Sequence, residues 1–412
     1  MHDIAELDLP NLPMEDAAFS EDPLPHFAMA REQHPWLATC AFGLVITQYQ
    51  AMRDLLWLDH SMTTANAGVV EIMDAEGTEW GRFQHEMLGA CQGEAHKRIR
   101  SALAPAFTPQ QAKRHRPLMR EVIAGLLDEW APKGAFDFEE FAAQFPIAVM
   151  CGLIGASPGA VPEIRASLET FGLSFSLDRA LLPELEKATR LLDGFVQNLV
   201  ADRQKHRNPG SEKDLLEILL ETLDSGGLSE RELYDLLIFA LVAGYDTSKN
   251  ALTLLMDVMI QRPELYQRCA EDLDFCRKVT EENFRYLTTS TIPRLTVKDL
   301  TYQDVRIPAG TMLFFPVSIA GRDSQSFDRP DQFDPNRAEL RKHLTFGMGM
   351  HICLGQFIAR AQIQEGLHQI AQRITKPRRV GPSAWRPFYG VWGLRGLPIE
   401  FDPAPARELG QA

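Results

Sequence analysis

The stretch that decides the fold is Phe346-Gly347-Met348-Gly349-Met350-His351-Ile352-Cys353-Leu354-Gly355, in which two glycines precede a lone cysteine. From Leu354 onward, apolar residues recur with helical spacing, which predicts an amphipathic helix that ends before Pro377. The cysteine would then lie at the N-terminus of a helix, where free N–H groups favour a thiolate. The glycines let the backbone approach a flat, bulky group because they carry no Cβ atom. A thiolate held in an otherwise apolar loop is suited to ligating haem iron.

Cys353 also has plainer interpretations. Most lone cysteines behave as small buried hydrophobic residues. His351 and Cys353 could instead be zinc ligands, but the sequence nearby offers neither a C-x-x-C pair nor a second histidine pair. The ten-residue run as a whole is far more specific than a single cysteine.

Bulk composition excludes several classes of protein. The chain has 412 residues, and its hydrophobic content of 45% is ordinary for a globular protein. A net charge of −14 argues against non-specific binding to nucleic acid and against adhesion to anionic membranes. The six cysteines have no framework spacing, which favours reduced thiols in a cytoplasmic protein. No signal peptide is recognisable, and no run approaches the ~18 apolar residues of a membrane span.

The longest predicted helix begins at a capping box formed by Ser229 and Glu232 and ends before Pro263. Its middle, residues 236–244, is apolar on every side, so we expect it to be the buried axis of the fold. Other helices are predicted over residues 110–130, 138–153, 183–206 and 214–223. An extended run over 43–47 and a hairpin over 305–317 are the strand signals. Together these elements predict a mainly α fold with a small β lobe (α+β). We expect it to form a single large domain over residues 1–412.

A second motif, Gly155-Ala156-Ser157-Pro158-Gly159, matches the G-x-S-x-G nucleophile elbow of serine hydrolases. Such an elbow needs a strand before it and a helix directly after it. Residues 146–154 continue the helical pattern that starts at Phe138, so the Pro/Gly cluster is better explained as the end of that helix. A serine hydrolase is therefore a distant alternative.

The run from Phe346 to Gly355 resembles the haem-binding signature of cytochrome P450. Phe346, Gly347, Gly349, His351, Cys353 and Gly355 stand in the expected places. The resemblance implies the cytochrome P450 fold around a haem b (iron protoporphyrin IX), with Cys353 as the axial ligand of the iron. The spacing of Arg294, nine residues after Arg285, is similar to the bacterial camphor-hydroxylase type of this family.

Polar residues interrupt the long helix at Ala243-Gly244-Tyr245-Asp246-Thr247-Ser248. Gly244 costs roughly 1 kcal/mol relative to alanine in a helix interior, and Thr247 can bond the carbonyl four residues back. A plain explanation is a helix that passes from core to surface, with Asp246 solvated. The resemblance implies instead the acid–alcohol pair of the family, in which Gly244 opens a groove for dioxygen, Thr247 bonds the oxygen and Asp246 relays protons.

The resemblance also assigns two groups of supporting residues. Glu282 and Arg285, one helical turn apart, would form a buried ion network with Arg337 and have a structural role. The two haem propionates require cations, because an arginine fork meets a carboxylate with two hydrogen bonds. The matching residues are His96, Arg100, Arg294 and His351.

Substrate-pocket positions carried over from the family are mostly apolar. They are Leu241, Val242, Ala243, Ser290, Ile292, Val391 and Trp392. We expect a small or medium hydrophobic substrate, terpenoid- or aromatic-like, with one oxygen that a hydroxyl can orient. Residues 63–88 and 171–182 are expected to be mobile covers over the site.

No flavin or iron–sulfur domain is recognisable, so electrons would come from a separate [2Fe-2S] ferredoxin and its NAD(P)H-dependent reductase. A basic patch for docking is expected from Lys97, Arg98, Lys113, Arg114, Arg116, Arg341 and Lys342. The predicted function is an O2-activating monooxygenase that works as a monomer in the cytoplasm, without a nucleic-acid or membrane partner. A peroxide-driven or non-catalytic haem protein is the alternative.

Overall fold

Helices dominate the computed structural model, which describes residues 2–207 and 213–403. The helices are α1 (Ala17–Glu21), α2 (Pro23–Gln33), α3 (Tyr49–Leu55), α4 (Asn66–Ile72), α5 (Glu79–Glu86), α6 (Gly93–Leu103), α7 (Pro109–Arg114), α8 (Arg116–Trp130), α9 (Phe138–Ile154), α10 (Val161–Phe171), α11 (Leu182–Lys205), α12 (Leu215–Asp224), α13 (Glu230–Ile260), α14 (Pro263–Glu271), α15 (Leu273–Tyr286) and α16 (Gln356–Arg373). The strands are β1 (His2–Asp3), β2 (Leu37–Cys40), β3 (Gly43–Ile46), β4 (Met62–Thr64), β5 (Ala135–Asp137), β6 (Ile292–Thr296), β7 (Leu300–Tyr302), β8 (Val305–Ile307), β9 (Met312–Phe315), β10 (Ile374–Arg379), β11 (Ala384–Trp385), β12 (Leu394–Arg395) and β13 (Pro398–Pro403). The predicted α+β class is confirmed.

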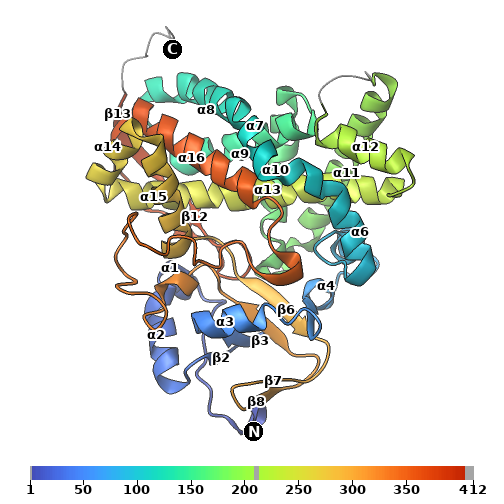
Figure 1. Ribbon diagram of the computed structural model, residues 1–412, viewed down its shortest axis with the longest axis vertical. Coiled ribbons are helices and arrows are strands. Elements are labelled where there is room, and N and C mark those ends of the chain that lie inside the picture. Colours follow the sequence, from blue (N-terminus) through green and yellow to red (C-terminus); the bar gives the residue numbers. More distant parts are fainter. Residues whose placement is uncertain (1, 208–212, 404–412) are drawn as a thin grey trace.

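The long helix α13 is the axis of the helical part, as predicted. Its capping box is present, since Ser229 accepts from the Glu232 N–H and Glu232 accepts from the Ser229 N–H. The helix has 31 residues, which is about 47 Å at the usual rise. It packs against α9, α11 and α16, and Figure 1 shows it crossing the helical half of the molecule.

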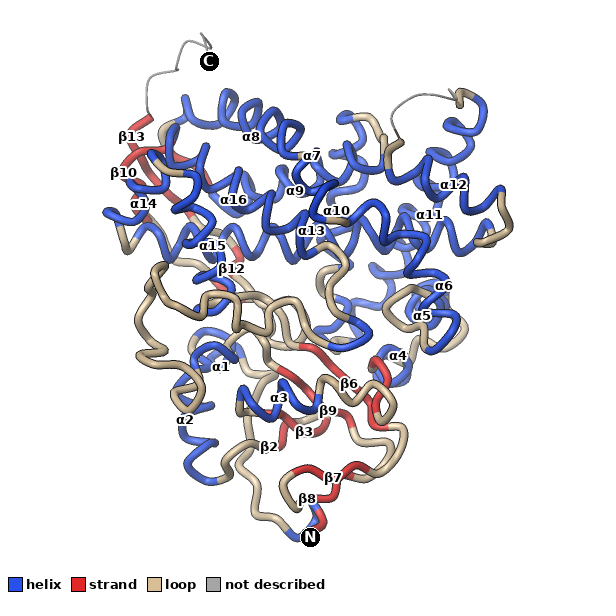
Figure 2. The backbone as a smooth tube through the Cα atoms, in the orientation of Figure 1, coloured by secondary structure: helices blue, strands red, loops and turns tan. Residues whose placement is uncertain are grey.

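Most strands form a smaller lobe below the helices in Figures 1 and 2, whereas β10 and β13 lie beside the helices at the upper left of Figure 2. The main sheet of the lobe has five strands in the order β2-β3-β9-β6-β4. Strand β6 pairs with both β9 and β4, so the segment that carries Arg294 is fixed on two sides. This sheet supports the lower wall of the site.

The predicted hairpin over residues 305–317 is wrong. Strand β8 pairs with β7 and β1 in one sheet, whereas β9 pairs with β3 and β6 in another. The turn itself exists, with Gly310 at φ +80°. The Thr296 hydroxyl bonds Pro308 O at 2.7 Å and accepts from Thr311 N at 2.8 Å, and these bonds direct the chain into the second sheet.

Two other helical predictions are refined by the structure. The helix expected over residues 110–130 is divided at His115 into α7 and α8, because Pro117 has no N–H to continue the hydrogen-bond ladder. Helix α9 ends at Ile154, with Gly155 in the left-handed region at φ +70°. The G-x-S-x-G motif therefore follows a helix and lacks the strand of a nucleophile elbow. None of the described helices is long and apolar enough to cross a bilayer.

Candidate functional site

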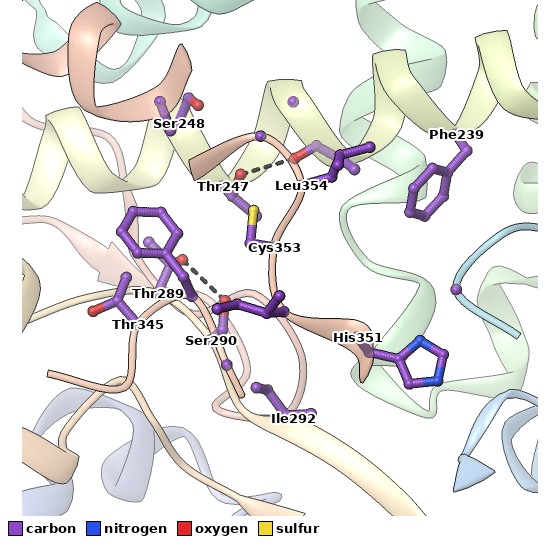
Figure 3. A pocket seen from close by; sticks show the side chains of 18 of the residues that line it. Phe239, Thr247, Ser248, Thr289, Ser290, Ile292, Thr345, His351, Cys353 and Leu354 are labelled. Carbon is purple, nitrogen blue, oxygen red and sulfur yellow. Dashed lines mark hydrogen bonds between the residues drawn. The ribbon is translucent and has the colours of Figure 1, made fainter. Parts of the chain in front are cut away.

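A largely apolar cavity of about 440 Å³ lies between α13 and the loop that precedes α16. Its lining comes from segments spread between Thr64 and Ile363. Figure 3 shows Cys353, Thr247, His351 and Ser290 among the residues that line it. The sequence motifs that carry chemistry therefore converge on one space, although they are far apart in the chain.

Cys353 lies in a tight loop just before α16. The loop is closed by a 2.8 Å hydrogen bond from Cys353 N to Phe346 O, and Gly347 and Gly349 have positive φ angles of +67° and +72°. A Cβ atom on Gly349 would lie 2.6 Å from an Asp59 carboxylate oxygen. The backbone conformation thus explains why glycine stands at both positions.

The Cys353 thiol is accessible from the cavity but surrounded by protein, and this burial raises its pKa. The Gly355 N–H bonds the sulfur and, with Arg100 and Arg360, acts in the opposite direction. These three groups stabilise the thiolate form of Cys353, which is the form that binds a metal ion. Among residues 2–207 and 213–403 there is no cluster of His, Cys, Asp or Glu that could hold a zinc ion.

A second layer under the loop was not predicted from the sequence. Glu281 on α15 accepts from Arg360 Nε at 2.6 Å and lies 3.1 Å from His343 Nε2. Arg360 in turn lies over the Phe346 ring, 4.3 Å from its centroid. These contacts fix Phe346, and through it the loop that carries Cys353.

Four nitrogen-bearing side chains line one part of the cavity: His96, Arg100, Arg294 and His351. The two histidine rings are 4.6 Å apart. Burial lowers the pKa of Arg294 to about 10, and burial with the nearby Arg294, His96 and Arg100 lowers the pKa of His351 to about 3.

These four groups have few acceptors in the described part of the chain. Arg294 donates to Pro293 O, Arg100 donates to Ile352 O, and His96 Nε2 is buried without a partner. Buried donors and cations are costly unless an anion or acceptor meets them. Two carboxylates in the cavity would satisfy this set, so the residues present fit a haem with its two propionates.

The interrupted segment of α13 presents its residues in two directions. Gly244 and Thr247 line the cavity, and the Thr247 hydroxyl donates to Ala243 O at 2.9 Å. A Cβ atom on Gly244 would lie 2.8 Å from Met150 Sδ, so this glycine also permits the close packing of α13 on α9.

Asp246, by contrast, does not line the cavity. Its buried carboxylate accepts from Arg386 and, at 3.1 Å, from Asn250, and Lys249 Nζ lies 3.6 Å away. Oδ2 has no partner among the described residues. Of the predicted acid–alcohol pair only Thr247 faces the cavity, because adjacent helical residues point about 100° apart.

Of the residues predicted for the substrate pocket, Ala243, Ser290 and Ile292 line the cavity. Leu241, Val242, Val391 and Trp392 lie outside its lining. Leu241 and Val242 face the packed core, which the helical periodicity of α13 explains. Trp392 is buried, with its indole N–H donating to Ser20 O at 2.8 Å and its ring stacked on Trp385.

Several lining residues were not predicted. Phe239, Ala240 and Ala251 line the cavity, and their spacing from Ala243 and Thr247 is the helical signal that could have found them. Thr64, Asn66, Leu88, Gly89 and Phe175 also line it. All of these except Gly89 lie within the segments predicted as covers, but the sequence contains no local signal for which of their residues face the cavity.

The two segments expected as covers meet each other in the structure. Phe83 and Phe171 pack edge to face with ring centroids 5.6 Å apart. Arg179 Nε donates to Ile72 O, and Trp80 N donates at 2.6 Å to Oε1 of Glu186 on α11, just beyond the second segment. The first segment is also tied to the rest of the protein, by the pairing of β4 with β6 and by the 3.0 Å ion pair of Arg82 with Asp235 on α13.

The ion network under the site is assembled as expected. Glu282 and Arg285 are completely buried and form a 2.7 Å ion pair, and Arg337 Nε lies 3.1 Å from the same Glu282 oxygen. Arg285 also donates to the carbonyl oxygens of Gly321, Pro330 and Gln332. These three residues do not line the cavity.

The expected basic patch is largely neutralised. Lys97 pairs with Glu94, Arg98 with Glu232, Arg116 with Glu365 and Lys342 with Glu339. Lys113 and Arg341 are exposed and have no partner among the described residues. The patch is therefore weaker than the sequence alone indicates.

Comparison with known proteins agrees with this geometry. The family model described as "Cytochrome P450" matches residues 163–375. Luteothin monooxygenase of Streptomyces thioluteus is 32% identical, over 96% of this chain and 97% of the relative. Mycinamicin IV hydroxylase/epoxidase of Micromonospora griseorubida is 31% identical, over 68% of this chain and 70% of the relative. The crystal structure of epothilone D-bound P450epoK has the same fold, with a TM-score of 0.85 and 20% sequence identity. The match covers 95% of this chain and 99% of that one.

Proposed function

The chain belongs to the cytochrome P450 family and is a haem-dependent monooxygenase, and we propose that it hydroxylates a small or medium hydrophobic substrate with electrons from a separate ferredoxin. The observation that carries the proposal is that Cys353 and Thr247 line one largely apolar cavity. Product formation from NAD(P)H and dioxygen with a reconstituted [2Fe-2S] ferredoxin and its reductase tests it. If the substrate were oxidised only when peroxide is supplied, and not with ferredoxin and dioxygen, the peroxide-driven alternative would hold instead.

Cys353 is the residue that would ligate the iron. His96, Arg100, Arg294 and His351 would hold the propionates. A bound haem supplies the activation of dioxygen, for which a thiolate ligand favours O–O cleavage. The Gly355 N–H would hold the sulfur in its charged state, because a hydrogen bond to the charged form favours it. We propose the whole chain as one haem-thiolate domain, since residues from Thr64 to Ile363 build a single cavity.

Proton delivery in this proposal depends on the polar segment of α13. The Thr247 hydroxyl lies in the cavity and can donate a hydrogen bond there if it leaves Ala243 O. Asp246 lies behind it, with one carboxylate oxygen free of partners among the described residues, and can pass a proton by way of water. The two covers exclude bulk water, which limits the unproductive loss of protons and electrons.

Replacing Thr247 with valine tests this role, because valine keeps the shape and removes the hydroxyl. We expect NAD(P)H consumption to continue while product formed per NAD(P)H falls by at least about tenfold. Thr253→Val is a matched control: Thr253 forms the same type of bond on α13, to Lys249 O, but does not line the cavity. Equal coupling in the two variants would remove Thr247 from the mechanism.

The proposed substrate is a terpenoid- or aromatic-like molecule. Leu88, Phe175, Phe239 and Ile292 give the cavity apolar walls, and Ser290 adds a hydroxyl. The names of two relatives, a monooxygenase of luteothin and a hydroxylase/epoxidase of mycinamicin IV, describe oxygen insertion into organic compounds. Screening small hydrophobic compounds for a change in haem spin state tests the class. A response to fatty acids alone would contradict it.

We propose an acidic [2Fe-2S] ferredoxin as the electron donor, docked near the exposed Lys113 and Arg341. The expected result is that kcat/KM for the ferredoxin falls roughly tenfold as salt rises from about 0.01 M to about 0.5 M. The double variant Lys113→Gln/Arg341→Gln should flatten that dependence. Lys187→Gln, at an exposed position on α11, should leave it unchanged, and salt-insensitive reduction of the wild type would argue against this docking site.

The proposed location is the cytoplasm. All six cysteines are free thiols, as expected where glutathione and thioredoxin keep thiols reduced.

A further inference from the structure

A buried carboxamide pair forms part of the cavity wall. Asn66 is the first residue of α4, lines the cavity and is 4% exposed. Its Nδ2 donates at 2.9 Å to Oε1 of Gln84 on α5, which is 2% exposed. Thus both cover helices on this side contribute one amide to a single buried contact.

The position of Asn66 is fixed from two directions. Strand β4 ends two residues before Asn66, and its Thr64 pairs with Arg294 of β6 in the main sheet. On the other side, the bond to Gln84 holds the carboxamide plane. A side chain fixed in this way loses little conformational freedom when it binds a ligand, which is the usual property of a specificity contact.

Asn66 lines the cavity and has unused hydrogen-bonding capacity. Its Oδ1 atom has no hydrogen-bond partner among the described residues and is not completely enclosed by protein. Of the lining residues between positions 63 and 89, Leu88 and Gly89 are apolar or have no side chain, and Thr64 is the only other polar one; Phe175 and Phe239 add further apolar surface. An amide oxygen in such surroundings is costly unless a donor meets it.

We infer that Asn66 is a specificity-determining contact of the cavity, selecting hydrophobic substrates that carry a hydroxyl or N–H group. The inference rests on the proposed monooxygenase function and names the substrate class of that same site. It differs from the hydroxyl-based recognition by Ser290, because the Ser290 hydroxyl already lies 3.3 Å from the Thr289 hydroxyl.

Two ligands that differ by one hydroxyl provide the test: 4-cyclohexylphenol and cyclohexylbenzene. Their dissociation constants are measured on purified holoenzyme by optical titration and by equilibrium dialysis, without ferredoxin or turnover. For the wild type we expect the phenol to bind about tenfold more tightly than the hydrocarbon, once affinities are corrected for solubility. Asn66→Leu should reduce this ratio to about one.

Three further variants make the outcome decisive. Asn66→Asp keeps an acceptor and should retain the preference for the phenol. Glu71→Gln, on the exposed side of the same helix, should behave as the wild type. If leucine prevents haem incorporation, Asn66→Ala replaces it, since a smaller side chain cannot clash.

An unchanged ratio in Asn66→Leu or Asn66→Ala, or a wild type without any preference, would overturn the inference. Failure of the proposed function gives a different result. In that case both ligands bind with the expected ratio but neither is oxidised when ferredoxin and reductase are supplied.

Discussion

Replacing Cys353 with serine should abolish the CO spectrum of a thiolate-ligated haem and reduce turnover by at least about a hundredfold. Serine is nearly isosteric, so the loop should survive, held by the bond from residue 353 N to Phe346 O. What is lost is the charged sulfur that Gly355, Arg100 and Arg360 stabilise. The measurements are the reduced CO-difference spectrum and product formation with ferredoxin.

The control for this experiment is Cys91→Ser. Cys91 is also a free, partly exposed thiol, but its sulfur contacts the carbonyls of Glu86 and Met87 and it does not line the cavity. Its variant should keep both spectrum and activity. If the serine variant at position 353 also kept both, the assignment of the metal ligand would be wrong.

Local signals in the sequence predicted a large part of this molecule. The capping box at Ser229, the glycines before Cys353 and the run at Gly244 each have a physical reason within a few residues, and each is found where expected. The ion network of Glu282 was also placed correctly. Here, however, the information came from the family resemblance rather than from any property of the segment.

Long-range relations were the ones that the sequence did not reveal. The hairpin after Val305 failed because Thr296, far from the turn in sequence, holds the turn and sends β9 to another sheet. Asp246 was predicted as a proton relay, but the sequence gives no sign of its buried partner Arg386, which lies 140 residues away. The contact of Asn66 with Gln84 was missed for the same reason, since no residue near Asn66 in the sequence indicates that Gln84 is its partner.

The buried network of Glu282 gives the largest expected effect on stability. Glu282 Oε1 accepts from Arg285 Nη2, Asp334 N and Arg337 Nε, and Oε2 accepts from Arg285 Nε. Glutamine at this position would turn an N–H2 group toward one of these donors and leave Arg285 buried without a counter-charge. We expect Glu282→Gln to lower the free energy of unfolding by about 3–5 kcal/mol, measured as a fall in the urea midpoint.

Glu339→Gln is the matched control, because Glu339 forms an exposed pair with Lys342. Its cost should stay within about 0.5 kcal/mol.

Many buried ion pairs can be exchanged for hydrophobic residues at little cost, but this one should not be exchangeable. Arg285 also donates to the carbonyls of Gly321, Pro330 and Gln332, and these acceptors would remain buried if both charges were removed. The double variant Glu282→Leu/Arg285→Leu should therefore remain destabilised by at least about 2 kcal/mol. If that double variant instead had the wild-type urea midpoint, the backbone carbonyls around Arg285 would not need its hydrogen bonds. The role of Arg285 would then be limited to neutralising Glu282.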